Sequence, residues 1–223
     1  MNPVIKQLIL KDWRLNRWQI VFTMECGAVA LAILLFKTEP AVVVGSVWFF
    51  ISLIFVGCML PGTNILNERK KQNLPFLMSL PVSSVQYTTA KFLSTVGMYL
   101  VPWLTLAIAA VWFIAGRSIL PHGVIPMALV LLMLPFIGFS LIMGLTLVGE
   151  TEGWNILGNA VCNSSYGLTW YFIARTPVLN RDFGSKVAVW SPAVLTLLGG
   201  EFALIALILG MTFYLQSRKR DFV

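Results

Sequence analysis

Charged residues are scarce in this sequence. Lys, Arg, Asp and Glu make up 11% of the 223 residues, whereas soluble domains carry about 25%. Hydrophobic residues reach 58%, and the mean hydropathy is +0.83. A soluble fold has too little interior to hide that much apolar surface. The composition therefore excludes a soluble domain and predicts a protein that crosses a lipid bilayer several times.

Side chains suited to catalysis or metal binding are also few. His122 is the only histidine, and the three cysteines, Cys26, Cys58 and Cys162, show no CxxC spacing, so neither a histidine-based zinc site nor a redox pair is predicted. No GxxxxGK[ST] sequence occurs, so the chain has no P-loop of its own. We expect no enzyme activity, metal or cofactor in this chain. Any ATP and Mg²⁺ would be bound by a partner ATPase.

Long apolar segments predict an all-α membrane protein with six transmembrane helices. Each segment approaches or exceeds the roughly 20 residues that cross the hydrocarbon core as a helix, and none shows the alternation of a barrel strand. The predicted spans are residues 19–36, 41–66, 92–116, 125–148, 156–174 and 191–215. No repeat or linker separates them, so we expect residues 1–223 to form a single domain.

Three segments outside the spans have distinct patterns. Residues 1–18 place apolar side chains at helical spacing among four cations, which is typical of an amphipathic helix in the cytoplasmic interface. An unstructured basic leader is the alternative. Residues 67–91 form the longest cytoplasmic loop. Residues 175–190 form an outer loop that is long enough to hold a short re-entrant or interfacial helix.

The distribution of basic residues predicts the orientation of the chain. With the N-terminus inside, eleven Lys and Arg residues fall in cytoplasmic segments and five in outer ones, in agreement with the positive-inside rule. An even number of spans then places both termini in the cytoplasm. This topology explains the net charge of +7 without nucleic acid as a partner. We expect the inner or plasma membrane of a prokaryotic cell.

A short apolar cluster interrupts the cytoplasmic loop. It follows the charged run ERKK and ends at Pro81. Its apolar residues are Leu74, Phe76, Leu77, Met78 and Leu80. An apolar helix outside the membrane is costly unless it is buried against a surface. The cluster therefore predicts a docking element for another protein, with burial at the membrane surface as the alternative.

Polar residues within the spans are the remaining candidates for function. Glu25 and Glu201 are costly to bury in lipid, and either can pair with a partner, bind a cationic substrate, carry a proton or act as a packing carboxylate. The fifth span carries polar residues at helical intervals, which line a wet pathway or join helices by hydrogen bonds. The candidates for the pathway are Asn155, Asn159, Cys162, Asn163, Tyr166 and Thr169.

The stretch ERKKQNLPFLMSLPVSSVQYTTAKFL resembles the signature of type-2 ABC exporter permeases, the membrane subunits of ATP-driven transporters. In that family an acidic residue and a basic cluster end the second span. A coupling helix and an S/T-LPVS motif then lead to a lysine that opens the third span. The matching residues are Glu68, Arg69, Met78, Ser79, Leu80, Pro81, Val82, Ser83 and Lys91. One departure is that Gln72 and Asn73 stand where many relatives have a glycine.

This resemblance implies a permease that pairs with a second copy or a sibling and with two cytoplasmic ABC ATPase subunits. It implies that Glu68, Arg69 and residues 74–81 dock into the ATPase, and that the second and fifth spans line the dimer interface and pathway. The leading hypothesis is an exporter permease for a lipid, peptide or hydrophobic small molecule. A proton- or ion-coupled carrier using Glu201 and Glu25, and a non-transporting membrane assembly factor, are the alternatives.

Overall fold

A computed structural model describes residues 3–67, 84–117, 120–177 and 184–218. The long helices of this part are α1 (Pro3–Leu34), α2 (Glu39–Pro61), α5 (Ser84–Arg117), α6 (Ile125–Gly149), α7 (Glu152–Arg175) and α9 (Pro192–Arg218). The π-helix η1 (Gly62–Leu66) extends α2, and the 3-10 helix η2 (His122–Val124) precedes α6. The predicted all-α class is confirmed for the described residues.

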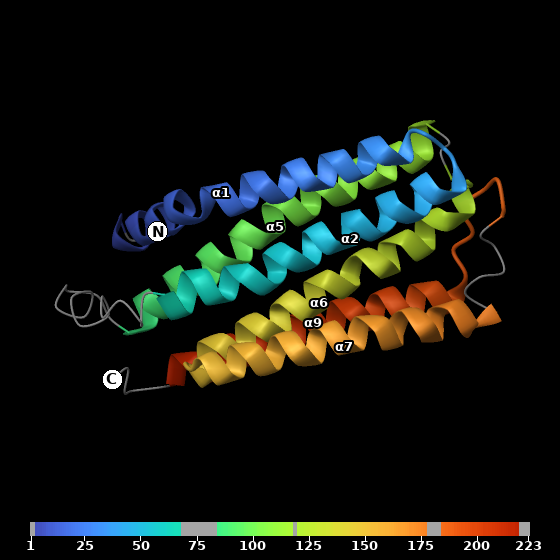
Figure 1. Cartoon of the computed structure of the whole chain (residues 1–223). Coiled ribbons are helices and arrows are strands. Elements are labelled where there is room, and N and C mark those ends of the chain that lie inside the picture. Colours follow the sequence, from blue (N-terminus) through green and yellow to red (C-terminus); the bar gives the residue numbers. More distant parts are fainter. Residues whose placement is uncertain (1–2, 68–83, 118–119, 178–183, 219–223) are drawn as a thin grey trace.

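The long helices run side by side and form one elongated bundle (Figure 1). The start of α1, the end of α2 with η1, the start of α5 and the end of α9 lie together at one end, called here the terminal end. The α1–α2 turn, the start of α6 and the start of α9 lie at the other, the distal end. Both described flanks of residues 68–83 are therefore at the terminal end.

Five of the six long helices are long and apolar enough to cross a membrane. These segments are Ile5–Leu34, Glu39–Leu66, Gln86–Gly116, His122–Gly149 and Pro192–Arg218. They correspond to the first, second, third, fourth and sixth predicted spans, so a multi-pass membrane protein is confirmed. α7 contains the predicted fifth span, residues 156–174, but is not among the five, because its many polar side chains lower its hydropathy. The sixth crossing stays a prediction.

α1 differs from the sequence-based expectation. Residues 1–18 were expected to form a separate interfacial helix, whereas α1 continues without a break for 32 residues. No proline or glycine interrupts the chain between Pro3 and Gly27, and the polar side chains of Asp12 and Asn16 are buried in the bundle. The first half of α1 is thus held by other helices, and the prediction of a separate helix is wrong.

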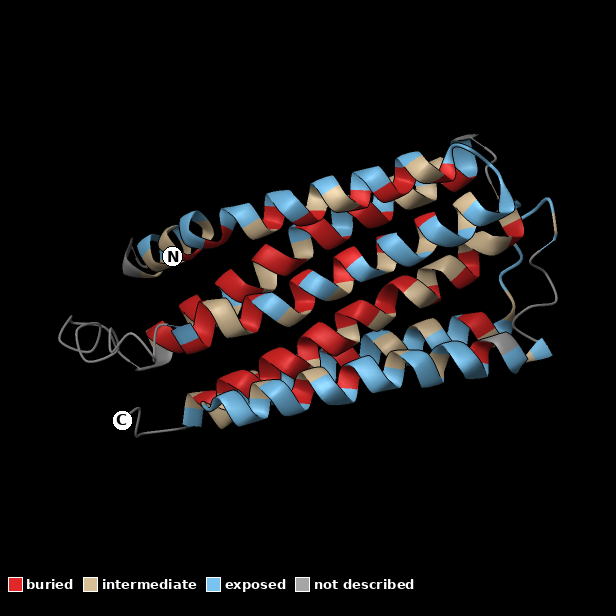
Figure 2. Cartoon of the chain, in the orientation of Figure 1, coloured by how far each residue is buried: buried red, intermediate tan, exposed pale blue. Residues whose placement is uncertain are grey.

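The centre of the bundle is built from α2, α5 and α6. Leu53, Tyr99 and Phe139, one from each helix, have no exposed surface. The rings of Tyr99 and Phe139 stack with their centroids 4.1 Å apart, and Trp103 donates its Nε1–H to the buried carbonyl of Leu132 at 2.8 Å. α6 packs against α2, α7 and α9. α7 and α9 expose much of their surface (Figure 2).

The distal end is tied together by hydrogen bonds around η2. The Gly123 N–H donates to the carbonyl of Ser185 at 3.0 Å. The ring nitrogens of His122 lie 3.1 Å from the carbonyl oxygen of Lys186 and 3.2 Å from that of Ala115. Residues 184–190 contain no helix. Residues 178–183 lie outside the described part, so a short helix within residues 175–190 stays a prediction.

Candidate functional site

The residues predicted to dock into an ATPase lie outside the part of the chain that the structure describes. They are Glu68, Arg69, Leu74, Phe76, Leu77, Met78, Ser79, Leu80 and Pro81. Both helices that this segment connects are described, however. η1 at the end of α2 precedes it, and α5 follows it. The described residues closest in sequence to the predicted docking segment are therefore those of η1 and the start of α5.

A buried ion pair lies where η1 and α5 meet α1. The Lys91 Nζ atom is 2.9 Å from Oδ1 and 3.0 Å from Oδ2 of Asp12, and the two side chains are only 3% and 1% exposed. Lys91 belongs to α5 and Asp12 to α1. A charge pair this deeply buried is stable only if its remaining hydrogen-bonding capacity is also satisfied.

Neighbouring polar groups satisfy that capacity. Lys91 also donates to the backbone carbonyl of Asn64 in η1 at 3.1 Å, and the Ser94 hydroxyl donates to Asp12 Oδ2 at 2.8 Å. The Asn64 amide donates to Ser94 and to Thr95, at 3.2 and 2.7 Å. The Thr95 hydroxyl donates to the Lys91 carbonyl. We call these five residues the polar joint.

The local sequence explains why η1 can take part in the joint. Pro61 has no backbone N–H, and the wider π turn begins at the next residue. Single π turns inside α-helices are frequent at functional sites. This turn directs both the carbonyl and the side chain of Asn64 toward α5. The polar joint thus ties α1 to the two helices that flank residues 68–83.

Sequence reasoning missed the joint, although a signal was present. Lys91 was interpreted as a topology charge and as part of the family motif, and Asp12 was not singled out. Asp12 is the only acidic residue among the first 24. A lone acid within a basic helical segment is a candidate partner for a buried cation. What the sequence does not give is the cation, which is 79 residues away.

The polar face of α7 divides between two neighbours. Toward α6, the Asn155 amide donates to the Thr146 hydroxyl at 2.8 Å, and the buried Cys162 thiol lies 3.6 Å from the Gly138 carbonyl. Toward α2, the Asn163 side chain lies near Cys58, while its amide donates to the Asn159 carbonyl of its own helix at 2.8 Å. Part of the predicted pathway face therefore serves helix packing.

Tyr166 and Thr169, the other two predicted pathway residues, have different surroundings. A Cβ atom built on Gly138 would lie 1.8 Å from the Tyr166 hydroxyl, so Tyr166 packs directly over that glycine of α6. Thr169 is half-buried, and neither residue lines the polar cavity at the terminal end. The sequence pattern alone did not separate these packing positions from cavity-lining ones.

Asn155 and Asn159 line a polar cavity of about 250 Å³ at the terminal end. Residues of α2, η1 and α7 enclose it, including Cys58, Thr63 and Glu152. The Asn159 amide donates to Asn155 Oδ1 at 3.1 Å. We call this the α2–α7 vestibule. It is the place where predicted pathway residues meet open space, and it adjoins η1, which is part of the polar joint.

Comparison with known families decides the class of the protein. A family model described as "ABC-2 family transporter protein" matches residues 7–217. The chain belongs to this family. No curated protein and no solved structure matches it. The suspected type-2 ABC permease is confirmed at this level: the chain is a membrane subunit of an ABC transporter, and such subunits associate with a separate ABC ATPase.

The two intramembrane acids of this ABC-2 permease are not brought together. Glu25 is exposed on α1, and Glu201 is half-buried on α9. α1 packs mainly on α2 and α5, whereas α9 packs mainly on α6. Glu201 Oε2 is buried without a hydrogen bond from the described residues. No paired carboxylate site results.

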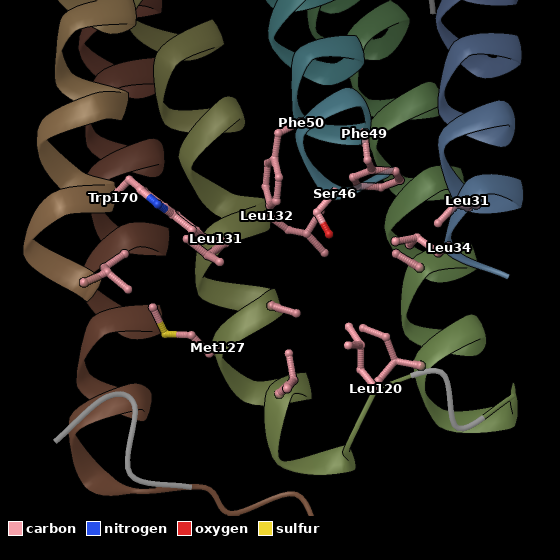
Figure 3. Close-up of a pocket in the computed structure, with 15 residues that line it drawn as sticks. Leu31, Leu34, Ser46, Phe49, Phe50, Leu120, Met127, Leu131, Leu132 and Trp170 are labelled. Carbon is pink, nitrogen blue, oxygen red and sulfur yellow. The ribbon is translucent and has the colours of Figure 1, made fainter. Parts of the chain in front are cut away.

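A second cavity occupies the distal half of the permease. Its volume is about 420 Å³, and side chains of α1, α2, α5, α6 and α7 line it (Figure 3). Ser46 and Trp170 supply the only hydroxyl and N–H groups among the lining side chains. The cavity is partly open, and its almost entirely apolar lining suits an apolar occupant better than water.

Proposed function

We propose that this chain is the permease of an ABC exporter that moves a hydrophobic or amphipathic molecule outward while its partner ATPase hydrolyses ATP. The cargo would be a lipid, a peptide or an apolar small molecule. The family match supports the transporter class. The observation that carries the coupling mechanism is the polar joint, because it ties both flanks of residues 68–83 to α1 through buried charged groups.

In this proposal residues 68–81 dock into the ATPase and transmit its closure to the membrane helices. A displacement of that segment pulls on η1 and α5. The polar joint resists separation of these elements from α1, since breaking a buried ion pair costs about 3–5 kcal/mol. The three helices would therefore move as a unit, and the α2–α7 vestibule, whose wall includes η1, would change its access.

The proposed complex contains two permease chains and two ATPase subunits that bind ATP and Mg²⁺. The second permease chain is either another copy of this chain or a related sibling. α7 supports the pairing, because Asn163, Ser164 and Ser165 are exposed in the middle of this helix. Exposed polar side chains are unfavourable against lipid and favourable at a helix interface. A second chain covering α7 would give six crossings per chain, with both termini in the cytoplasm of a prokaryote.

The docking step is tested by co-purification with the ATPase. A tagged permease purified from its native cells should retain a P-loop ATPase, and the variant with Leu77→Asp and Leu80→Asp should lose it. The matched control carries Gln72→Glu and Asn73→Asp, which add the same two negative charges without removing an apolar side chain. Retention of the ATPase by the leucine variant would contradict docking through this segment.

The coupling step is tested by the accessibility of Cys58. In a variant with Cys26→Ser and Cys162→Ser, Cys58 is the only thiol and lines the α2–α7 vestibule. Its rate of modification by a charged maleimide should change when ATP and vanadate trap the ATPase. That change should vanish when Asp12→Leu and Lys91→Met are added together. A nucleotide response that survives in this variant would refute coupling through the polar joint.

A further inference from the structure

The distal cavity has the shape and depth of a site for a hydrocarbon chain. Val124 and Leu132 both line it, and eight residues of helix correspond to roughly 12 Å along the bundle axis. Phe50 and Leu120 lie at opposite ends of the cavity, with Leu120 toward the distal loops (Figure 3). The cavity is thus elongated in the direction in which acyl chains lie in a bilayer, with its outer limit at the level of the distal loops.

The lining chemistry excludes water as the filler. A water molecule needs two to four polar partners, and apolar cavities of this kind stay dry and take up apolar molecules. Ser46 and Trp170 come from different helices, α2 and α7, and the other lining residues offer no hydroxyl, amide or charged group. Within a membrane, the abundant apolar molecule of matching form is the acyl chain of a lipid.

The charges at the distal end indicate the headgroup. Three basic residues are exposed at this end, namely Lys37, Arg175 and Lys186. Among the side chains described there, the acidic residue is Glu39, so positive charge is in excess. Lys37 follows Leu34 by three residues, and Arg175 follows Ile173 by two; Leu34 and Ile173 both line the cavity. Cations beside the outer limit of an acyl site complement a phosphate group.

We propose that the distal cavity binds one acyl chain of a glycerophospholipid from the leaflet at the distal end, with the lipid phosphate at the level of the exposed cations of that end. The site does not depend on the transport proposal. Its lining residues are separate from the polar joint and from the α2–α7 vestibule. The acyl chain occupies the partly open cavity and covers its apolar lining.

The test uses photochemical labelling of the full-length permease in nanodiscs without an ATPase, which keeps it separate from any test of transport. The probe is phosphatidylglycerol with a diazirine in one acyl chain. Mass spectrometry should locate adducts on lining residues between Met127 and Leu132, and native mass spectrometry should show one retained phospholipid per chain. Adducts confined to residues on the outer surfaces of the helices would overturn the proposal.

Cavity-filling variants supply the decisive comparison. Ala128→Phe places a ring in the cavity and should abolish the adducts and the retained lipid, whereas Ala32→Phe, at an exposed position of α1 near the same end, should change neither. If Ala128→Phe does not fold, Ala110→Phe on α5 fills the cavity from another side. A folded cavity-filled variant that is labelled like wild type would refute the site. Equal labelling by a diacylglycerol with the same chain would overturn the phosphate contact, and with it the choice of a phospholipid.

Discussion

Substitution of Lys91 should destabilise the permease by breaking the buried ion pair of the polar joint. Lys91→Met leaves the Asp12 carboxylate 1% exposed, with the Ser94 hydroxyl as the remaining donor described by the structure. Removing one partner of a buried pair costs about 3–5 kcal/mol, because the other charge is left uncompensated. We expect that loss in the free energy of unfolding, which is a large fraction of the stability of a domain.

The double variant with Asp12→Leu and Lys91→Met should recover most of this loss. Both charges are gone, and Ser94 can donate fully to the backbone carbonyl of residue 91, which is already 3.1 Å away. What remains is the backbone carbonyl and the side-chain Oδ1 of Asn64 without their ammonium partner, at about 1–3 kcal/mol. The double variant should therefore be more stable than Lys91→Met, with a coupling energy of at least about 2 kcal/mol between the two sites.

The assay is an SDS titration of the permease in dodecyl maltoside micelles, followed by circular dichroism. The matched control is Arg14→Met, which removes an exposed cation two residues from Asp12 and should change the free energy of unfolding by less than about 0.5 kcal/mol. Two observations would refute the reasoning. One is a loss below about 1 kcal/mol for Lys91→Met. The other is a double variant as unstable as the sum of the single ones.

Three other predictions concern the packing of α6 and the role of Glu201. Gly138→Ala should lower the free energy of unfolding by about 1–3 kcal/mol, because the added methyl group clashes with the Tyr166 hydroxyl. Adding Tyr166→Phe should recover part of this loss. Equal stability of Gly138→Ala and wild type in the same titration would contradict this packing. Trp103→Phe should cost about 1 kcal/mol, because the Leu132 carbonyl loses its donor, and amide exchange in α6 should accelerate. Glu201→Gln should leave the ATPase rate of the reconstituted complex unchanged, whereas a carrier driven by protons through this residue would lose its dependence on a proton gradient.

The sequence predicted the helices well and the boundary within α1 badly. Apolar runs long enough to cross a bilayer define five of the long helices to within a few residues at most ends. The first span was predicted to begin near Gln19, because four cations precede it. Hydropathy treats each of those residues alone. A hydropathy average contains no information on the partners of Asp12 and Asn16, which lie inside the bundle or in the same helix. The predicted first span therefore began too late in α1.

The pathway candidates show a similar limit. Helical spacing correctly placed polar residues at regular intervals on α7, yet Cys162 and Asn159 sit on that face with different neighbours. Which residue packs and which lines a cavity depends on the glycines of the adjacent helix. Gly138 lets Tyr166 approach α6 closely. The spacing of residues within α7 does not show which of them can approach α6, because the positions of the glycines in α6 decide this.

The polar joint shows why buried charges are the least predictable part of such a chain. A lysine placed by the positive-inside rule and a lysine buried in an ion pair look the same in the sequence, since both stand at the border of a predicted span. They differ in their partners, which here come from residues 79 and 27 positions away. The topology rule alone predicts only that a basic residue stands at such a border. The ion pair with Asp12 explains why an uncharged residue of similar size would not replace it alone.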